Sequence, residues 1–445
     1  MEKVYLSQLL KDVAIPMEDV VVSSVVVDSR EVKKDSVFLA IRGERVNGED
    51  YAAKAIENGA CYVLTEHMID DVPAHKQAIV PNILDASIAL GGNFRDLFSL
   101  DVVGVTGSVG KTSTKDFAYT ALAPFAKTVR SLGNHNNEIG MPQTIFGFAH
   151  DDKFAILEMG MDDLGDVHKL SCAAKPKYAV ISCIGVSHME KLGSQENILK
   201  AKLEICDGMD KDGVLVLNGD DKFLSKAEIS NPLNVKYFAI ENKDADVTAK
   251  DIVQDGLFTN FTICDKIRGE FSCTIPVVGN HNVMNALSAY TLVTAMGFDP
   301  QQTAENLKGY VPSGMRGKIV AKDDVTYIED CYNASPDSMR AAVNTVCSVA
   351  KGRKICVFGD MLELGADSAQ MHTDVGAYAK EKGVDMMLCF GSEAQYIATG
   401  FGDGMLFGSK AELAQYLKDI LQKDDAVIFK ASRGMKFEEI INLVY

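Results

Sequence analysis

Short apolar runs alternate with segments of helical periodicity along most of the chain. The clearest runs are rich in Val and Ile and cover residues 102–105, 154–158, 178–183 and 214–217. Runs without polar alternation are typical of strands that are buried on both faces of a parallel sheet. A helical pattern at residues 196–209 separates the last two runs. The alternation therefore predicts a doubly wound, mostly parallel α/β domain at residues 99–312.

Two further α/β units flank this central part. The first, residues 1–98, is a small N-terminal domain with strands expected at 20–27, 36–41 and 61–65 and helices at 51–58 and 83–98. The second, residues 313–445, is a Rossmann-like domain with strands expected at 354–358, 385–390 and 426–430 and helices at 367–382 and 410–422. Three domains agree with a length of 445 residues, which is too long for a single core.

One stretch of the central domain departs from the alternation. Residues 246–278 read as short antiparallel strands joined by turns at residues 254–256 and 268–269. The pattern predicts an antiparallel edge on an otherwise parallel sheet.

The amino-acid composition and net charge exclude several classes of protein. Hydrophobic residues make up 47% and charged residues 24%, as in ordinary soluble proteins. The net charge of -17 argues against nucleic-acid binding but does not exclude small anionic ligands. Ten scattered cysteines without a Cys-x-x-Cys motif suit a reducing cytoplasm and argue against a cysteine-rich zinc site. No signal-peptide core and no bilayer-length apolar run is found, so we expect a cytoplasmic location without membrane insertion.

The most informative motif is a Gly-rich loop between a strand and a helix, at residues 106–112. Gly107 and Gly110 allow the backbone N–H groups to face one anion, and the helix that follows adds positive potential. Lys111 can reach the outer phosphates of a nucleotide, and Thr112 can bind Mg²⁺. The usual loop has glycine at the position of Val105, so the motif predicts a phosphate loop of a variant class. A chance Gly-rich turn is the alternative, but the flanking pattern favours the loop.

Three residues follow or end neighbouring strands of the central domain. Glu158 ends one strand and His188 follows another, so both should lie at the carboxyl edge of the sheet, where ligands bind. An acid beside a phosphate loop can hold Mg²⁺. A solvated acid and a surface histidine are the alternatives. The sequence pattern alone does not distinguish Lys202 from Lys200 on the next helix.

Polar loops in the central domain offer amide side chains. Asn136 and Asn137 lie in a loop of three Asn and two Gly residues at 134–142, which indicates a polar binding loop. Asn282 and Asn285 open a helix, where they could read a purine edge or, for Asn282, act as a helix cap.

Two loops of the C-terminal domain also lie between a strand and a helix. Asp330 is a candidate ribose or water ligand, and Ser335 fits a helix cap before Pro336. Lys430 and Arg433 form a plausible anion site at a second helix start. Structural capping explains each loop nearly as well.

Together these motifs resemble the Mur ligases, the ATP-dependent amide-forming enzymes of bacterial cell-wall synthesis. They occur in family order over essentially the whole chain: TGSVGKT (106–112), LEMG (157–160), SHMEKLGS (187–194), KAKLEI (200–205), GNHNVMNALSA (279–289), GMRGK (314–318) and DCYNASPDSM (330–339). The phosphate loop of the family also lacks the first glycine.

The resemblance implies the roles of individual residues. The implied catalytic residues are Lys111, Glu158, His188, Lys202 and Arg316. The implied ATP site is formed by Gly107, Ser108, Gly110, Lys111, Thr112, Ser113, Asn282, Asn285, Arg316 and Asp330. Two Mg²⁺ ions are implied, held by Thr112, Glu158, His188 and a carbamylated Lys202. The implied substrate-binding residues are Ser29, Arg30 and Asn47 of a UDP-binding N-terminal domain, and Asn136, Asn137, Asn333 and Ser335.

Within the family, three motifs are most similar to those of members that join D-alanyl-D-alanine to UDP-N-acetylmuramoyl-tripeptide. They are Tyr332 to Pro336, Gly359 to Gly365 and Lys430 to Arg433. The implied reaction proceeds through an acyl phosphate and releases ADP, and a monomer is expected. One turn departs from the family, since Glu49 stands where histidine is common.

Other functions remain open from the sequence. The third-residue-adding Mur ligase shares Asp28-Ser29-Arg30, but its Asn-Pro-Arg signature is absent here. Folylpolyglutamate and cyanophycin synthetases are other ligases of the superfamily. A P-loop switch or motor ATPase and a non-enzymatic nucleotide-binding scaffold are further alternatives. A ligase alone should require both a carboxylate and an amine substrate for phosphate release.

Overall fold

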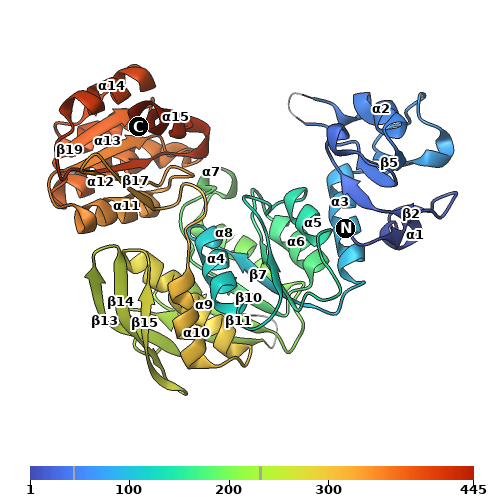
Figure 1. The fold of residues 1–445 in the computed structure, drawn as a ribbon, viewed down its shortest axis with the longest axis horizontal. Helices are drawn as coiled ribbons and strands as arrows, with labels where there is room; N and C mark the ends of the chain where they lie inside the picture. Colours follow the sequence, from blue (N-terminus) through green and yellow to red (C-terminus); the bar gives the residue numbers. More distant parts are fainter. Residues whose placement is uncertain (44–45, 230–232) are drawn as a thin grey trace.

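The computed structural model describes residues 1–43, 46–229 and 233–445. Figure 1 shows three α/β units in the order of the sequence, with the N-terminal unit on the right and the C-terminal unit at the upper left. The predicted α/β fold is confirmed, since each unit is built on a parallel or mostly parallel sheet. Among the helices described, none combines the length and apolarity that a membrane span requires.

The N-terminal unit contains a parallel sheet of order β3-β4-β5-β6 and a separate antiparallel pair, β1 and β2. Its elements are β1 Val4–Tyr5, α1 Leu6–Leu9, β2 Val21–Val22, β3 Ser24–Val26, β4 Ser36–Leu39, α2 Ala52–Glu57, β5 Ala60–Thr65, β6 Gln77–Ile79 and α3 Ile83–Arg95, with 3₁₀ turns η1 Ser29–Glu31, η2 Gly48–Tyr51 and η3 Ala74–Lys76.

The single strand predicted at residues 20–27 is wrong, because the chain changes sheets at Ser23. The Ser23 N–H donates to the Asp35 carbonyl oxygen at 2.8 Å, and its hydroxyl donates to the Lys34 carbonyl oxygen at 2.8 Å. These bonds to a neighbouring turn separate β2 from β3. An apolar run does not reveal such a switch, since both short strands are Val-rich.

The central unit is built on a nine-stranded sheet of order β15-β14-β13-β12-β11-β10-β7-β9-β8. Its elements are β7 Asp101–Thr106, α4 Lys111–Leu122, β8 Thr128–Arg130, α5 Gly140–Ile145, β9 Phe154–Glu158, α6 Asp166–Ala174, β10 Tyr178–Ile181, α7 Met189–Leu192, α8 Gln195–Leu203, β11 Val214–Asn218, β12 Asn234–Ala239, β13 Val247–Asp255, β14 Phe258–Asp265, β15 Gly269–Ile275, α9 Asn280–Ala295 and α10 Pro300–Asn306, with η4 Glu204–Cys206, η5 Leu224–Lys226 and η6 Leu307–Gly309. The predicted antiparallel edge is confirmed, since β13, β14 and β15 pair antiparallel.

Strand β7 lies between β10 and β9 and runs parallel to both. The register pairs Thr106 with Ile181 and Val105 with Glu158. The loops that follow these three strands therefore meet at one edge of the sheet, at the point where ligands bind in open α/β folds.

The C-terminal unit has a six-stranded sheet of order β16-β17-β21-β18-β19-β20, in which β16 and β17 pair antiparallel. Its elements are β16 Lys318–Lys322, β17 Val325–Glu329, α11 Pro336–Val349, β18 Lys354–Gly359, α12 Ser368–Glu381, β19 Met386–Phe390, α13 Ala394–Phe401, β20 Met405–Leu406, α14 Lys410–Ile420, β21 Ala426–Lys430 and α15 Glu438–Val444, with η7 Gly365–Asp367 and η8 Arg433–Met435. This unit is the second doubly wound sheet that the sequence predicts.

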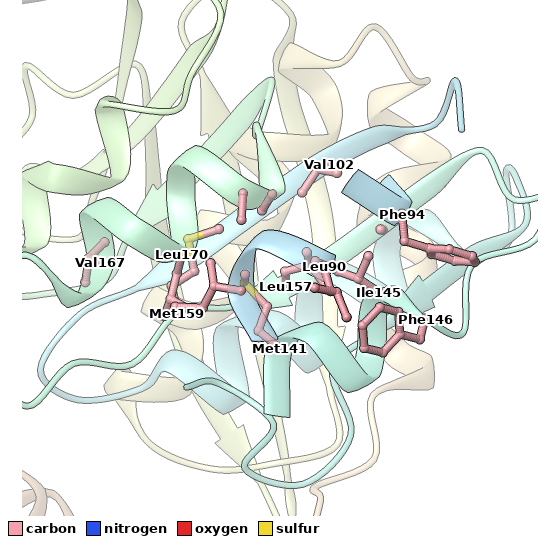
Figure 2. Packing of buried hydrophobic residues seen from close by; sticks show 14 of the residues in the cluster. Leu90, Phe94, Val102, Met141, Ile145, Phe146, Leu157, Met159, Val167 and Leu170 are labelled. Atoms are coloured by element: carbon pink, nitrogen blue, oxygen red, sulfur yellow. The ribbon is translucent and has the colours of Figure 1, made fainter. Parts of the chain in front are cut away.

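Helix α3 joins the N-terminal and central units through a shared hydrophobic core. Asn82 caps the helix by accepting hydrogen bonds from the N–H groups of its first turn. Figure 2 shows Leu90 and Phe94 of α3 packed with Met141, Ile145 and Phe146 around α5. All of these side chains are buried, so the core is continuous on both sides of residue 98.

Two glycines allow α3 to lie close to its neighbours. A Cβ atom at Gly91 would lie 3.1 Å from Pro142 of α5, and one at Gly92 would lie 3.3 Å from Ala173 of α6. Larger side chains at these positions would force the helices apart, because packed interiors leave little room for added atoms.

We expect Phe94→Ala to lower the free energy of unfolding by about 3–5 kcal/mol, because it removes a fully buried ring at this junction. Urea denaturation followed by fluorescence or circular dichroism measures the change. The control is Phe258→Ala at the start of β14, where the side chain is exposed, which should change stability by less than about 0.5 kcal/mol. Equal effects of the two substitutions would contradict a shared core at α3.

Candidate active site

The Gly-rich loop connects the end of β7 to the first turn of α4. Gly107 has a φ of +142° and Gly110 a φ of +86°, which side chains other than glycine rarely adopt. The Ser108 N–H donates to the Cys183 carbonyl oxygen at 2.9 Å, and Lys111 Nζ donates to the Gly107 carbonyl oxygen at 2.7 Å. The loop thus curls at the positive end of the twelve-residue helix α4, as a phosphate site requires.

A buried oxygen cluster lies beside this loop. The Thr112 hydroxyl donates to Glu158 Oε2 at 2.8 Å, and Asn136 Nδ2 donates to Glu158 Oε1 at 2.9 Å. Glu158 is only 2% exposed. The structure therefore brings together three residues that the sequence placed in separate motifs. Carboxylate and hydroxyl oxygens are the ligands that Mg²⁺ prefers.

The protein alone does not supply a full metal-binding cage. Across residues 1–43, 46–229 and 233–445, no group of three or more His, Cys, Asp and Glu side chains is arranged to hold a metal ion. Mg²⁺ typically uses one or two carboxylates together with phosphate oxygens and water. The Thr112 and Glu158 pair fits that use.

Positive groups converge on the other side of the loop. Lys202 is fully buried, and its Nζ atom has no hydrogen-bond partner among the described residues. Burial, and next the charge of Lys111, lower the pKa of Lys202 well below 10.5. Burial therefore disfavours the charged form of Lys202 relative to the neutral amine, which is the nucleophilic form of lysine.

His188 lies in the same positive environment. Burial, followed by the charges of Lys202 and Lys111, lowers its pKa to about 4. The ring is therefore neutral at pH 7 and able to bind a metal. His188 has a φ of +63°, which is uncommon outside glycine, and such strain concentrates at functional sites. Its Nδ1 atom lies 3.0 Å from Glu363 Oε2 of the C-terminal unit.

The predicted adenine-binding amides take different positions. Asn285 Oδ1 accepts a hydrogen bond from the Thr114 hydroxyl at 3.1 Å and so lies against the helix of the phosphate loop. Asn282 Nδ2 donates to the Val278 carbonyl oxygen at 2.8 Å, which is a local contact at the start of α9. Asn285 is thus near the loop, whereas Asn282 has a structural contact.

A cavity of about 490 Å³ lies between the start of α9, the β13–β14 hairpin and α11. Its lining includes Asn280, His281, Asp337, Arg340 and Asn344. This volume lies in the range of small-molecule sites.

One residue that lines the cavity, Asp337, lies close to the phosphate loop. A Cβ atom built on Gly185 would lie 3.2 Å from both Asp337 Oδ2 and Ser108 Cβ. Asp337, which lines the cavity, and Ser108 of the loop therefore face each other across Gly185.

The predicted residues of the C-terminal unit are connected to one another. Lys430 Nζ, which is buried, donates to Asp330 Oδ2 at 2.7 Å and to the Asn333 carbonyl oxygen at 3.0 Å. Ser335 and Ser338 form a capping box at the start of α11. Lys430 therefore holds the 330–335 loop in place, and the carboxylate of Asp330 largely compensates the positive charge of Lys430. The Arg316 guanidinium lies 3.6 Å from the ring centre of Tyr332.

The predicted substrate-binding residues of the N-terminal unit have local partners. The Arg30 guanidinium bonds to both carboxylate oxygens of Asp28, and this contact lowers the pKa of Asp28 to about 2. Ser29 lies in the same turn, η1. Asn47 Oδ1 accepts from the Glu49 N–H at 3.3 Å, at the start of η2. The structure does not bring these residues together with the phosphate loop.

Asn137 also has a local role, because its Oδ1 atom accepts hydrogen bonds from the Ile139 and Gly140 N–H groups at the start of α5. It therefore differs from its neighbour Asn136, which reaches Glu158. The roles of both residues in substrate binding stay predictions.

Three functional neighbours were missed from the sequence. Glu363 contacts His188. The motif at 359–365 that contains Glu363 supports the family resemblance, but it does not predict this contact. Lys115 and Asp116 follow the phosphate loop as adjacent charges on a helix, a pattern typical of exposed residues, yet both are 2% exposed. Lys115 Nζ lies 4.0 Å from Glu158 Oε2. Only their proximity to the loop could have indicated burial.

Comparison with known protein families gives three matches in order along the chain. Residues 21–91 match the model for the catalytic domain of the Mur ligase family. Residues 105–293 match the Mur ligase middle domain, and residues 315–433 match the Mur ligase glutamate ligase domain.

Curated relatives and solved structures give the same result. The chain is 36% identical to the UDP-N-acetylmuramoyl-tripeptide–D-alanyl-D-alanine ligase of Bacillus subtilis, over 95% of this chain and 93% of the relative. A MurF crystal structure from Acinetobacter baumannii has a TM-score of 0.92 at 28% identity, covering 100% of this chain and 99% of that one. A Thermotoga maritima MurF structure in complex with ADP has a TM-score of 0.86 at 27% identity, covering 95% and 96%.

We expect Lys202→Met to raise the free energy of unfolding by about 1–4 kcal/mol near pH 7, since it removes a buried polar group without a partner. The folded-state pKa of Lys202 is lowered, so the unfolded chain binds more protons below pH 10.5. The stability of the wild type should therefore rise with pH, and the gain of the variant should shrink toward pH 10.5.

Thermal unfolding in CO2-free buffer across this pH range measures the difference. Lys200→Met is the matched control, because Lys200 is exposed on the same helix. A variant at position 202 that is less stable than wild type at every pH would contradict the neutral, unpartnered amine.

Proposed function

The chain belongs to the Mur ligase family, and we propose that it joins D-alanyl-D-alanine to UDP-N-acetylmuramoyl-tripeptide while converting ATP to ADP and phosphate. This reaction is a step of peptidoglycan precursor synthesis. The observation that carries the proposal is the identity of 36% over 95% of the chain to a ligase of that name. The buried contact between Thr112 and Glu158 beside the phosphate loop agrees with an ATP-dependent reaction.

ATP would bind with its phosphates on the loop and its nucleoside between the central and C-terminal units. Gly107, Ser108, Gly110 and Lys111 offer the phosphates N–H groups and a cation. The cavity between the start of α9 and α11 has the volume of a small-molecule site, which a nucleoside could occupy. Asn285, on α9, accepts a hydrogen bond from Thr114 in the first turn of α4, which supports a role near the nucleotide.

Mg²⁺ would be held at two places on this surface. Thr112 and Glu158 would hold one ion, and His188 with Lys202 would hold the other. When bound, the ions would neutralise phosphate charge and polarise the transferred phosphoryl group. The clustered oxygens at Thr112 and Glu158 and the neutral ring of His188 fit these roles.

Lys202 would take part as a carbamate. Its neutral amine nitrogen would bond to the carbon of CO2, the electron pair of one C=O π bond would move to oxygen, and the nitrogen would lose a proton to solvent, which gives an anionic oxygen ligand. The buried Nζ atom without a hydrogen-bond partner supports this change. A carbamate would also replace the repulsion between Lys202 and Lys111 with attraction.

The reaction would proceed in two displacements. The terminal carboxylate of the tripeptide attacks the γ-phosphorus of ATP, which forms an acyl phosphate and releases ADP. The amine of D-alanyl-D-alanine then attacks the acyl carbon, phosphate leaves with the bonding electrons, and the amine loses a proton. Lys111 and Arg316 would stabilise the charge on the transferred phosphoryl group. Closure of the C-terminal unit would exclude water from the acyl phosphate.

The remaining assignments follow the domain order. Ser29, Arg30 and Asn47 would bind the uridine nucleotide, Asp330 the ribose of ATP, and Asn333 and Ser335 the substrates. A monomer in the cytoplasm, where ATP is available, is part of the proposal.

Phosphate release tests the proposed function directly. Release should require ATP, UDP-N-acetylmuramoyl-tripeptide and D-alanyl-D-alanine together, and the product should have the mass of the joined pentapeptide. Release without the carboxylate substrate would indicate an ATPase. Release only with a single free amino acid would indicate the third-residue-adding ligase.

We expect Arg316→Ala to lower kcat/KM by about 100-fold or more, because it removes a cation from the developing phosphoryl charge. Steady-state phosphate release measures the effect. Arg268→Ala, at the outer β14–β15 turn, is the control and should keep kcat/KM near the wild-type value. A loss of less than about threefold in the position 316 variant would contradict this role.

A further inference from the structure

The segment that joins the central and C-terminal units is fixed to the phosphate-loop helix on one side. The ring of Tyr310 stacks on Phe117 of α4, with ring centres 3.6 Å apart and an angle of 1° between planes. The Ser313 hydroxyl donates to Asp116 Oδ2, also on α4, at 2.5 Å. In Figure 1 the chain passes from α10 beside α4 to the C-terminal unit. Tyr310 and Ser313 should therefore move together with α4.

The next residues are fixed to the C-terminal unit instead. The Tyr332 N–H donates to the Met315 carbonyl oxygen at 3.2 Å. The Arg316 guanidinium stacks on the ring of the same tyrosine at 3.6 Å. Met315 and Arg316 therefore move with the loop that follows β17.

A single residue, Gly314, separates the two attachments. Its φ of +62° lies in the left-handed region, where glycine is favoured. A Cβ atom built there would have only Arg316 within 4 Å, at 3.8 Å from its guanidinium nitrogen. The space around Gly314 is therefore largely open, as a pivot between the two attachments requires.

Asp116, which accepts the hydrogen bond from Ser313, is itself paired with two cations. Arg130 Nη1 lies 3.0 Å from Asp116 Oδ1, and Lys115 Nζ lies 3.4 Å from the same oxygen. Lys115 Nζ also donates to the Ser131 carbonyl oxygen at 2.9 Å and lies 4.0 Å from Glu158. One buried network thus connects Glu158 of the oxygen cluster to Ser313 at the start of the joint.

We propose that Ser313 and Asp116 are positioning residues that set where Arg316 meets the transferred phosphoryl group, with Gly314 as the pivot. The proposal rests on the phosphoryl-transfer role of Arg316 in the proposed function. Ser313 lies three residues before Arg316, so its hydroxyl fixes the base of the short arm that carries the guanidinium. Neither Ser313 nor Asp116 needs to contact substrate for this role.

A double-mutant cycle in the full-length enzyme tests the inference. Ser313→Ala should lower kcat by about tenfold or more, since small displacements of a catalytic group are costly, and should leave the KM for ATP within about twofold. Ser313→Thr keeps the hydroxyl and should restore kcat to within about threefold. In the Arg316→Ala background, Ser313→Ala should change kcat by less than about twofold, because both substitutions affect the same interaction.

A stability control separates positioning from folding. Ser409→Ala removes a helix-capping hydroxyl at the start of α14, away from the joint, and should cost about 1 kcal/mol without changing kcat. Thermal unfolding of the two Ser→Ala variants should show similar losses, and binding of an ATP analogue measured by calorimetry should be unchanged in both.

Distinct outcomes would overturn the inference. If Ser313→Ala retains kcat within threefold of wild type, or if its effect is equally large with and without Arg316, Ser313 does not act through Arg316. If Arg316→Ala itself is fully active, the inference falls together with the assigned role of Arg316. If the wild type shows no ligation with the named substrates, the proposed function has failed, which the wild-type assay reveals before any variant is compared.

Discussion

The position of β7 between β9 and β10 is the constraint on which the site depends. Because all three strands run parallel, their carboxyl ends meet, and Glu158 at the end of β9 comes within hydrogen-bond distance of Thr112 on α4. Neither residue reaches the other through local sequence, since 46 positions separate them. A shift of one residue in the β7–β9 register would turn the Glu158 side chain to the opposite face of the sheet.

Electrostatics adds a second requirement. Burial lowers the pKa values of Lys202 and His188, and the nearby charge of Lys111 lowers both further. An anionic ligand at the phosphate loop would offset this concentration of positive charge. Buried positive groups of this kind cost stability, and proteins often bear such a cost at functional sites.

The sequence predicts those parts of the fold and site that depend on local pattern or on strand order. The phosphate loop follows from glycine spacing, and the placement of Glu158 follows from its position at a strand end. The break at Ser23 and the burial of Lys115 and Asp116 could not be predicted, because both depend on partners distant in the chain. Asn136 and Asn137 illustrate the limit most clearly, since adjacent residues of one type have unrelated partners.

The close packing of α3 determines how the N-terminal unit is placed on the central unit. A helix of 13 residues is about 20 Å long, and its two glycines seat it directly on α5 and α6. The helix therefore holds the N-terminal unit at a fixed position on α5 and α6 of the central unit. A larger side chain at Gly91 or Gly92 would push α3 away from α5 or α6 and so shift the N-terminal unit relative to the central unit.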